Sequence, residues 1–358
     1  LTKCSQMKNP ILNLMAIMVF LSIFNSLSGQ VKTSNCDFRQ YAHYVNLAEL
    51  AITDSAYQKA IAFYDSAAQF IDSPFAKDRY NKTVCYALTG EYDQCRSGLI
   101  YLFGKGLDRQ KIRDNPAFTE FLLSETGKDL PILKVELTYN TRLRSVYDSL
   151  HYADQYFRIK HPKDYHDFDH DTITKIDASN VKMMNELIDE YGWPTEDLIG
   201  IDNLFGFQQY EIIIIHQHNY KYQIYNYAED VKKAYENCRI DVSKAAYLIV
   251  ESTGQDKMRA MDAGLVTYVF DPEGTYKTED LKLYRHKTGF FRMQDDKKEE
   301  INQKRRTFGL EPIDDLRRKV MFSERDKRFC FNFNGGKTGF TTASIEDYEY
   351  AVKNIVEF

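Results

Sequence analysis

The stretch AYQKAIAFYDSA, residues 56–67, decides the fold class that we expect. Its alanines and aromatic residues recur at intervals of three and four, which places them on one face of an α-helix. Three neighbouring stretches, at residues 38–52, 79–89 and 92–103, have the same spacing. Pro74 and Gly90 separate the stretches, and both residue types commonly end helices. We therefore expect four helices between residues 38 and 103.

The second helix pair partly repeats the first. Tyr57 and Tyr92 lie 35 residues apart, and so do Ala60 and Cys95. This pattern resembles tetratricopeptide repeats, whose period is about 34 residues, although Thr83 and Cys95 occupy small-residue positions in the second pair. The resemblance implies a helical-repeat module over residues 36–130 with a concave surface for a protein partner. Two repeats are few for a free-standing solenoid, so we expect the module to pack on the domain C-terminal to it.

The rest of the chain predicts more helices and few strands. Residues 204–218 include four consecutive isoleucines that would also suit a buried strand, but their length and the flanking helices favour a helix. We expect a mainly α fold, with a helical domain and a small β element at residues 131–325 and a C-terminal strand and helix at residues 326–358. Helices are expected at residues 116–124, 133–159, 178–191 (capped by Asp177), 204–218, 222–237, 241–252, 255–263, 295–307, 312–322 and 345–355, and strands at 265–270, 281–285 and 329–333.

Residues 1–30 have the pattern of a secretory signal peptide. A short positive region at Met7-Lys8 precedes an apolar run at residues 11–24, and small residues follow up to Gly29. We expect cleavage near Gly29 and export to the periplasm or out of the cell. An uncleaved anchor is the lesser alternative, because the apolar run is short for a membrane span.

Charge and cysteine content restrict the partners and the compartment. Residues 1–30 hold two lysines and no acid, so their removal makes the net charge of -5 more negative by two. An acidic chain is a poor nucleic-acid binder, because phosphate contacts need clustered Lys and Arg.

Export permits disulfides. The pairing stays open, although Cys85 and Cys95 flank the Gly90 turn and could face each other. Five cysteines follow the predicted cleavage point, so at least one is free or pairs between chains: Cys36, Cys85, Cys95, Cys238 and Cys330.

Two histidine-containing stretches have the side chains that zinc or iron binds. Residues 161–171 read HPKDYHDFDHD, but no His-Glu-x-x-His arrangement accompanies them, and we expect a solvated loop. His216 and His218 would point the same way only on a strand, whereas on a helix only one of them can face the interior. We therefore expect no metal and no cofactor.

Several short motifs follow one another in a recognisable order. Together they resemble a bacterial family of domains of unknown function, over about residues 135–320. The chain departs from that family after residue 248, where Val250-Glu251 replaces an Asp-Arg pair, and again around residues 258–269. The motifs are Asp154-Gln155-x-x-Arg158, Asp177-x-x-Asn180, Tyr191-Gly192-Trp193-Pro194, Gln217-His218, Ala246-Tyr247-Leu248 and Arg305-Arg306-x-x-Gly309-Leu310.

The motif residues predict one polar cleft. Asp154 and Arg158 are four residues apart on an expected helix, so they can form an ion pair. No Gly-rich phosphate loop and no Gly-x-Ser-x-Gly elbow is present. Our first hypothesis is a binding or scaffold protein that uses the helical repeats. The alternative is a hydrolase-like or ligand-binding enzyme with this cleft, whose candidate residues are Asp154, Gln155, Arg158, Asp177, Asn180, Trp193, Gln217 and His218.

Overall fold

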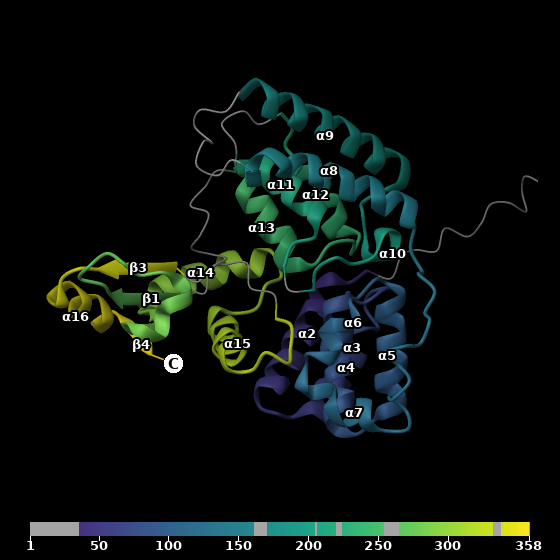
Figure 1. Cartoon of the computed structure of the whole chain (residues 1–358), viewed down its shortest axis with the longest axis horizontal. Coiled ribbons are helices and arrows are strands. Elements are labelled where there is room, and N and C mark those ends of the chain that lie inside the picture. Colours follow the sequence, from purple (N-terminus) through teal and green to yellow (C-terminus); the bar gives the residue numbers. More distant parts are fainter. Residues whose placement is uncertain are drawn as a thin grey trace, which may run out of the picture. The chain divides into compact units, whose positions relative to one another are not determined.

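The computed structural model of the chain is mainly helical and contains one small four-stranded sheet (Figure 1), which confirms the predicted fold class. The predicted signal peptide lies outside the described residues. No helix in the described part of the chain is long and apolar enough to span a membrane. The structure describes residues 36–160, 170–204, 206–219, 224–253, 265–331 and 338–357.

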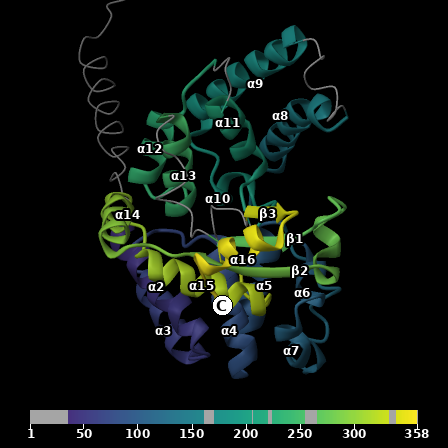
Figure 2. The same cartoon turned by 90° about the vertical axis from the view of Figure 1, so that its left-hand side faces the viewer.

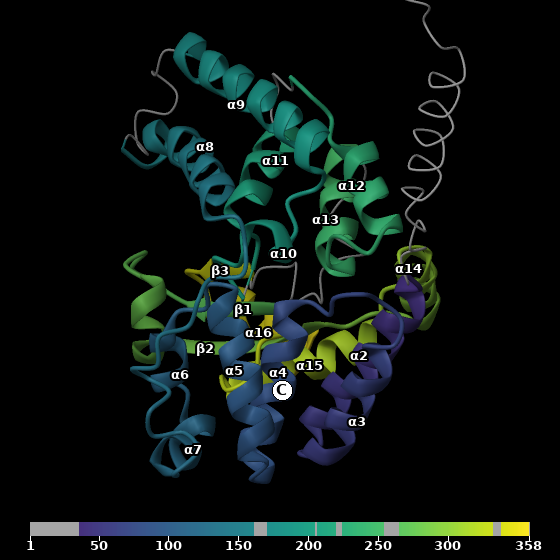
Figure 3. The same ribbon diagram turned by 90° about the vertical axis from the view of Figure 1, so that its right-hand side faces the viewer.

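The four helices expected at the N-terminal end are present and pack as neighbours (Figure 3). Asp37 caps the first of them by accepting the Gln40 N–H at 3.1 Å. Gly98 packs against Thr83 so closely that a Cβ at Gly98 would lie 2.3 Å from the Thr83 hydroxyl oxygen. This contact explains why small residues occur where two helices cross. The helices are α2 (Phe38–Thr53), α3 (Tyr57–Ala67), α4 (Ala76–Thr89) and α5 (Tyr92–Gly104).

The connector after α5 is longer than the sequence suggested. It contains α6 (Arg109–Arg113), a 3-10 turn η1 (Pro116–Phe118) and α7 (Thr119–Leu123). The next helix, α8 (Thr141–Lys160), begins eight residues after the expected start at Leu133. Two contacts explain the delay: the Thr138 N–H bonds the Gly104 carbonyl oxygen at 2.8 Å, and the Asn140 side chain caps α8 by accepting the Leu143 N–H at 3.0 Å.

A second helical group surrounds the isoleucine-rich stretch, which is a helix as predicted. Its core includes Tyr147, Met184, Ile213, Ile214 and Leu248, all buried. The expected boundaries were wrong in three places: Asp177 lies inside α9 rather than at its cap, α11 starts five residues after Leu204, and α12 starts six residues after Tyr222. The helix expected at 255–263 lies outside the described residues. The group comprises α9 (His170–Tyr191), α10 (Glu196–Ile199), α11 (Gln209–Asn219), α12 (Ala228–Glu236) and α13 (Val242–Thr253).

The sheet has the order β3-β1-β2-β4 and combines strands from both sides of the predicted boundary at residue 325 (Figure 2). β1 (Leu265–Phe270) runs antiparallel to β2 (Arg285–Phe291), with Leu265 opposite Phe290, and parallel to β3 (Thr338–Thr342). β4 (Ile355–Glu357) pairs antiparallel with β2. The strand expected at 281–285 was wrong, since a 3-10 turn η2 (Thr278–Leu283) occupies most of it.

Three helices accompany the sheet: α14 (Asp295–Thr307), α15 (Ile313–Arg325) and α16 (Ile345–Lys353). α14 and α15 share a small core with Leu265 and Phe290. α16 lies across the sheet, with Tyr348 packed near Phe270 (Figure 2). α15 also packs on α2, where Lys319 Nζ lies 2.7 Å from a Glu49 carboxylate oxygen.

The strand expected at 329–333 was also wrong for its described part, residues 329–331. These residues are buried in the core formed by the N-terminal helices. The Asn81 side chain makes the two main-chain hydrogen bonds that a neighbouring strand would otherwise make. Its amide donates to the Cys330 carbonyl oxygen and accepts the Cys330 N–H, both at 2.7 Å. Phe329 stacks on Tyr57 with ring centroids 5.9 Å apart.

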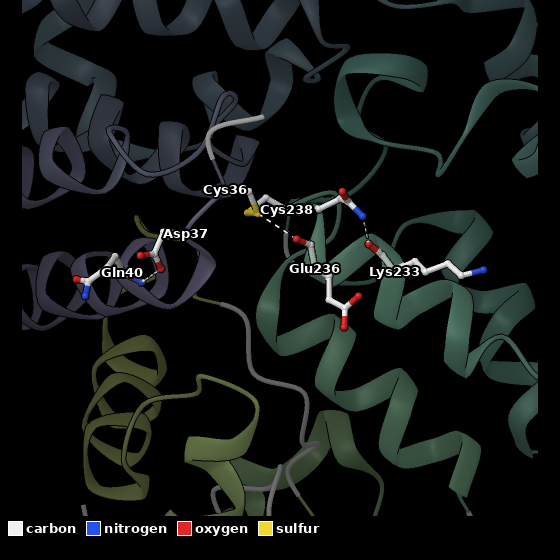
Figure 4. Close-up of a disulfide and its surroundings, with 7 residues drawn as sticks. Cys36, Asp37, Gln40, Lys233, Glu236 and Cys238 are labelled. Carbon is white, nitrogen blue, oxygen red and sulfur yellow. Dashed lines mark hydrogen bonds between the residues drawn. A yellow bond between two sulfur atoms is a disulfide. The ribbon is translucent and has the colours of Figure 1, made fainter. Parts of the chain in front are cut away.

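One disulfide joins Cys36, just before α2, to Cys238, just after α12 (Figure 4). Its two cysteines are 202 residues apart in sequence. Cys85, Cys95 and Cys330 are free and buried. Cys85 and Cys95 therefore do not form the bond that we considered, and their thiols pack as small apolar core groups, whereas the Cys330 thiol donates to the Leu204 carbonyl oxygen at 2.7 Å.

Candidate functional site

The predicted ion pair between Asp154 and Arg158 is present and forms the centre of a larger polar cluster. Arg158 extends from α8 between two carboxylates. Its Nη1 lies 2.9 Å from Asp154 Oδ1, and its Nη2 lies 3.0 Å from Asp177 Oδ2 on α9. Nη1 also donates to the main-chain oxygen of Asp154 at 2.6 Å. The guanidinium therefore links α8 to α9.

Asp154 is 1% exposed and is compensated from three directions. Arg158 donates to Oδ1, while the Gln155 amide and His216 Nδ1 both lie 2.7 Å from Oδ2. Burying a carboxylate is costly unless its oxygens are paired and hydrogen-bonded. These contacts meet that condition, and they fix the positions of all three partners.

His216 comes from α11, which packs beside α8 (Figure 3). A carboxylate only accepts hydrogen bonds, so Nδ1 of His216 carries a hydrogen and donates it to Asp154. The His216 side chain is 24% exposed, in contrast to the buried Asp154. The arrangement is that of a histidine oriented by a buried acid, which is how many enzymes position a general base.

His216 is the member of the site that sequence reasoning missed. We expected His218 instead, because it follows Gln217 in the family-like motif. The side chain of His218 lies outside the described residues. On a helix, His216 falls one turn after Ile213, which is fully buried. This spacing could have predicted that His216 lies on the buried face of its helix.

The other predicted residues have different surroundings. The Asn180 amide is buried and donates to the Leu150 carbonyl oxygen at 3.2 Å, which ties α9 to α8. The Gln217 amide oxygen accepts the Ile224 N–H at 3.3 Å. Trp193 is buried in the helical core, edge-on to Tyr210. The structure thus brings together Asp154, Gln155, Arg158 and Asp177 with His216, and it places Asn180, Gln217 and Trp193 in packing roles.

The electrostatics of the cluster are dominated by burial. Burial raises the pKa of Asp177, and the nearby negative charge of Asp154 acts in the same direction. Arg158 opposes both effects through its hydrogen bonds and its positive charge. Among the described residues, the Arg158 guanidinium pairs with both carboxylates, and His216 also lowers the pKa of Asp177.

A second polar region that no motif indicated lines a pocket between α10, α11 and α13. Lys244 Nζ lies 3.1 Å from a Glu211 carboxylate oxygen. Glu196 lines the same pocket, and its carboxylate accepts the Ala76 N–H at 2.6 Å, at the start of α4. Burial raises the pKa of Glu196 to about 7, against the opposing effects of that hydrogen bond and of Lys244.

Comparison with known proteins provides no relative: no family model, no curated protein and no solved structure matches the chain. The suggested likeness to a bacterial family therefore stays a prediction. Within the described ranges, no group of three or more His, Cys, Asp and Glu side chains is arranged to hold a metal ion. The histidine-rich residues 161–169 lie outside those ranges.

Proposed function

We propose that this protein is an enzyme that uses His216 as a general acid–base group on a small polar substrate. One observation carries the proposal: His216 Nδ1 lies 2.7 Å from the fully buried Asp154, while the imidazole remains partly exposed. A carboxylate in this position fixes the ring and its tautomer, and it stabilises the imidazolium that forms when Nε2 takes a proton. The chemistry that fits is activation of a water or hydroxyl, as in hydrolysis.

The hypothesis that the helical module, residues 36–130, binds a protein partner has weaker support. Its side chains Tyr57 and Asn81 already contact residues 328–331 of the same chain. Asn115 adds a third contact, donating to the Arg328 carbonyl oxygen at 2.7 Å. This part of the module is thus occupied internally, which favours the His216 site as the functional centre. Partner binding by the remaining module surface stays a secondary proposal.

Export is part of the proposal. The Cys36–Cys238 disulfide supports it, because disulfides persist in oxidising compartments such as the periplasm and the extracellular space. The signal-peptide pattern of residues 1–30 points in the same direction.

The test is a hydrolysis screen of the exported chain with chromogenic esters, amides, glycosides and phosphoesters. We expect wild type to hydrolyse at least one class, and His216→Ala to lose about 100-fold or more of that activity. His286→Ala is the matched control, since His286 Nδ1 bonds only a main-chain carbonyl oxygen, that of Tyr284 at 3.0 Å. Wild type without activity on every class, or equal activity in the two variants, would overturn the proposal.

A further inference from the structure

An open hollow with a volume of about 580 Å³ lies between the connector after α5 and the C-terminal end of α15. Its volume falls within the range of small-molecule sites, roughly 300–1,000 Å³. The connector contributes Lys111 and Asp114, and residues 325–328 form the opposite side. His216 does not line this hollow. The hollow is therefore a candidate site of its own.

Basic side chains outnumber acidic ones in the lining of the hollow. The lining contains two lysines, two arginines and two aspartates, so its formal charge is +2. Glu324 lies 3.9 Å from Lys327 Nζ, and including it leaves a formal charge of +1. The whole chain has a net charge of -5, so the positive charge is a local property of this hollow. Such a lining attracts anions.

Arg328 is held in place in this lining with part of its guanidinium unused. Nε lies 3.0 Å from Asp326 Oδ1, and Nη2 donates to Asp326 Oδ2 at 2.6 Å and to the Tyr57 hydroxyl at 3.2 Å. Asn115 fixes the main chain by donating to the Arg328 carbonyl oxygen at 2.7 Å. Nη1 forms no hydrogen bond with a residue in the described ranges, and the side chain is 29% exposed. Because the guanidinium is already ordered, binding a ligand costs it little conformational entropy.

Arg325 supplies a second guanidinium at the end of α15. Its side chain is exposed and forms no hydrogen bond or ion pair with another described residue. The paired N–H donors of a guanidinium match the spacing of phosphate oxygens. A phosphate monoester carries a charge of about -1.5 to -2 at neutral pH, which is close to the positive charge of the lining.

From these observations we propose that the hollow binds a small organic phosphate, a phosphate monoester whose oxygens accept hydrogen bonds from Arg325 and from Nη1 of Arg328. The two aspartates interrupt the basic surface, which favours one compact anion over an extended polyanion. This site is additional to the His216 site and does not depend on the proposed function.

Calorimetric titration of the full chain with glycerol phosphate, succinate and acetate at constant ionic strength tests the proposal. We expect glycerol phosphate to bind saturably, and succinate and acetate to bind at least about tenfold more weakly. Arg325→Ala should weaken glycerol phosphate binding about tenfold, because it removes a charged donor. Arg328→Lys keeps the charge but loses the planar fork, and we expect a loss of about the same size.

Arg113→Ala is the matched control, since this exposed arginine on α6 bonds Gln110 and does not line the hollow. We expect its affinity for glycerol phosphate to equal that of wild type. Arg325 has no partner among the described residues, so weaker binding in Arg325→Ala cannot come from a lost internal contact. Thermal unfolding of each variant verifies that the fold is retained.

Four results would overturn the proposal: no saturable binding of glycerol phosphate, unchanged affinity in Arg325→Ala, an equal loss in Arg113→Ala, or equally tight binding of succinate. His216→Ala separates the hollow from the proposed catalytic site. We expect this variant to bind glycerol phosphate as wild type does, because His216 does not line the hollow. Loss of binding in His216→Ala would assign the phosphate to the His216 site and would also overturn the proposal.

Discussion

The burial of a charged residue decides how much its ion pair contributes to stability, and α8 offers a direct comparison. Asp154 and Arg158 form a pair four residues apart, and so do Arg144 and Asp148 on the same helix. The Asp148 side chain is 45% exposed, whereas that of Asp154 is 0% exposed. The spacing is the same in both pairs, but Asp154 is buried and also contacts Gln155 and His216, so we expect the two pairs to differ in energy.

We expect Asp154→Asn to lower the free energy of unfolding by about 3 kcal/mol, because it leaves a buried guanidinium with one carboxylate in place of two. Asp148→Asn removes a carboxylate that is 45% exposed, and we expect a change of less than about 1 kcal/mol. Urea denaturation of both variants measures the difference. Equal losses would show that burial of Asp154 is not what makes its pair important.

Glu196 gives a prediction about pH. Its pKa of about 7 in the folded protein lies above the usual value of 4.5 because of burial. Between these values the folded state holds a proton that the unfolded chain has lost. Protonated Glu196 therefore contributes its full stabilisation of the folded state below pH 4.5, and this contribution is lost as the pH rises through about 7.

Glu196→Gln should remove this dependence, because the amide does not titrate. As the pH rises from about 4.5 to 8, we expect the free energy of unfolding of wild type to fall by about 3 kcal/mol relative to that of the variant. Denaturation curves at several pH values measure this fall. A difference between the two proteins that stays constant across the range would contradict the prediction.

At the scale of elements, close backbone contacts determine where helices end. Gly200 ends α10 with a φ of +74°, and a Cβ there would lie 2.7 Å from both the Lys105 carbonyl oxygen and a Tyr139 ring carbon. Gly192 ends α9 with a similar φ of +81°, but nothing lies within 4 Å of its added Cβ. Both glycines have a positive φ, and they differ in the space around them.

We expect Gly192→Ala to cost about 1 kcal/mol, the penalty of a left-handed conformation for a residue with a Cβ. Gly200→Ala should cost about 3 kcal/mol, since a φ of +74° with a ψ of −167° is a conformation that essentially only glycine adopts, and steric overlap adds to that strain. Thermal unfolding of the two variants measures both costs. Similar melting temperatures would mean that the loop after α10 moves away from Lys105 and Tyr139 at little cost.

At the scale of the whole molecule, covalent and ionic links join segments that are distant in sequence. The disulfide connects the start of α2 to the end of α12 (Figure 4). Glu49 on α2 contacts Lys77 on α4 at 2.8 Å and Lys319 on α15 at 2.7 Å, and all three side chains are buried. The helical module is therefore held to later parts of the chain at several points.

We expect loss of the disulfide in Cys36→Ser/Cys238→Ser to lower the unfolding free energy by about 4 kcal/mol, because the bond closes a long loop in the unfolded chain. Thermal unfolding with and without a reductant measures the effect. The reductant should destabilise wild type and leave the double variant unchanged, since Cys85, Cys95 and Cys330 are free. Sensitivity of the double variant to the reductant would contradict the assignment of this bond.

Part of this architecture could be predicted because it depends on neighbours in sequence. The spacing of small and aromatic residues predicted α2 to α5, and the four-residue interval of Asp154 and Arg158 predicted their ion pair. The same reasoning was wrong where a distant partner decides the outcome. Residues 329–331 have the composition of a strand, yet Asn81 and Tyr57 hold them in the helical core.

The helical class, the four N-terminal helices and the pair formed by Asp154 and Arg158 follow from the amino-acid sequence alone, because helical periodicity is a local property. Three features depend on the packing of distant segments: Asp177 and His216 join that pair, Cys36 bonds Cys238, and Trp193 packs in the core. These contacts depend on how α8, α9, α11 and α12 are placed in space. Local spacing cannot determine that placement, because it depends on the burial of apolar surface contributed by many helices together.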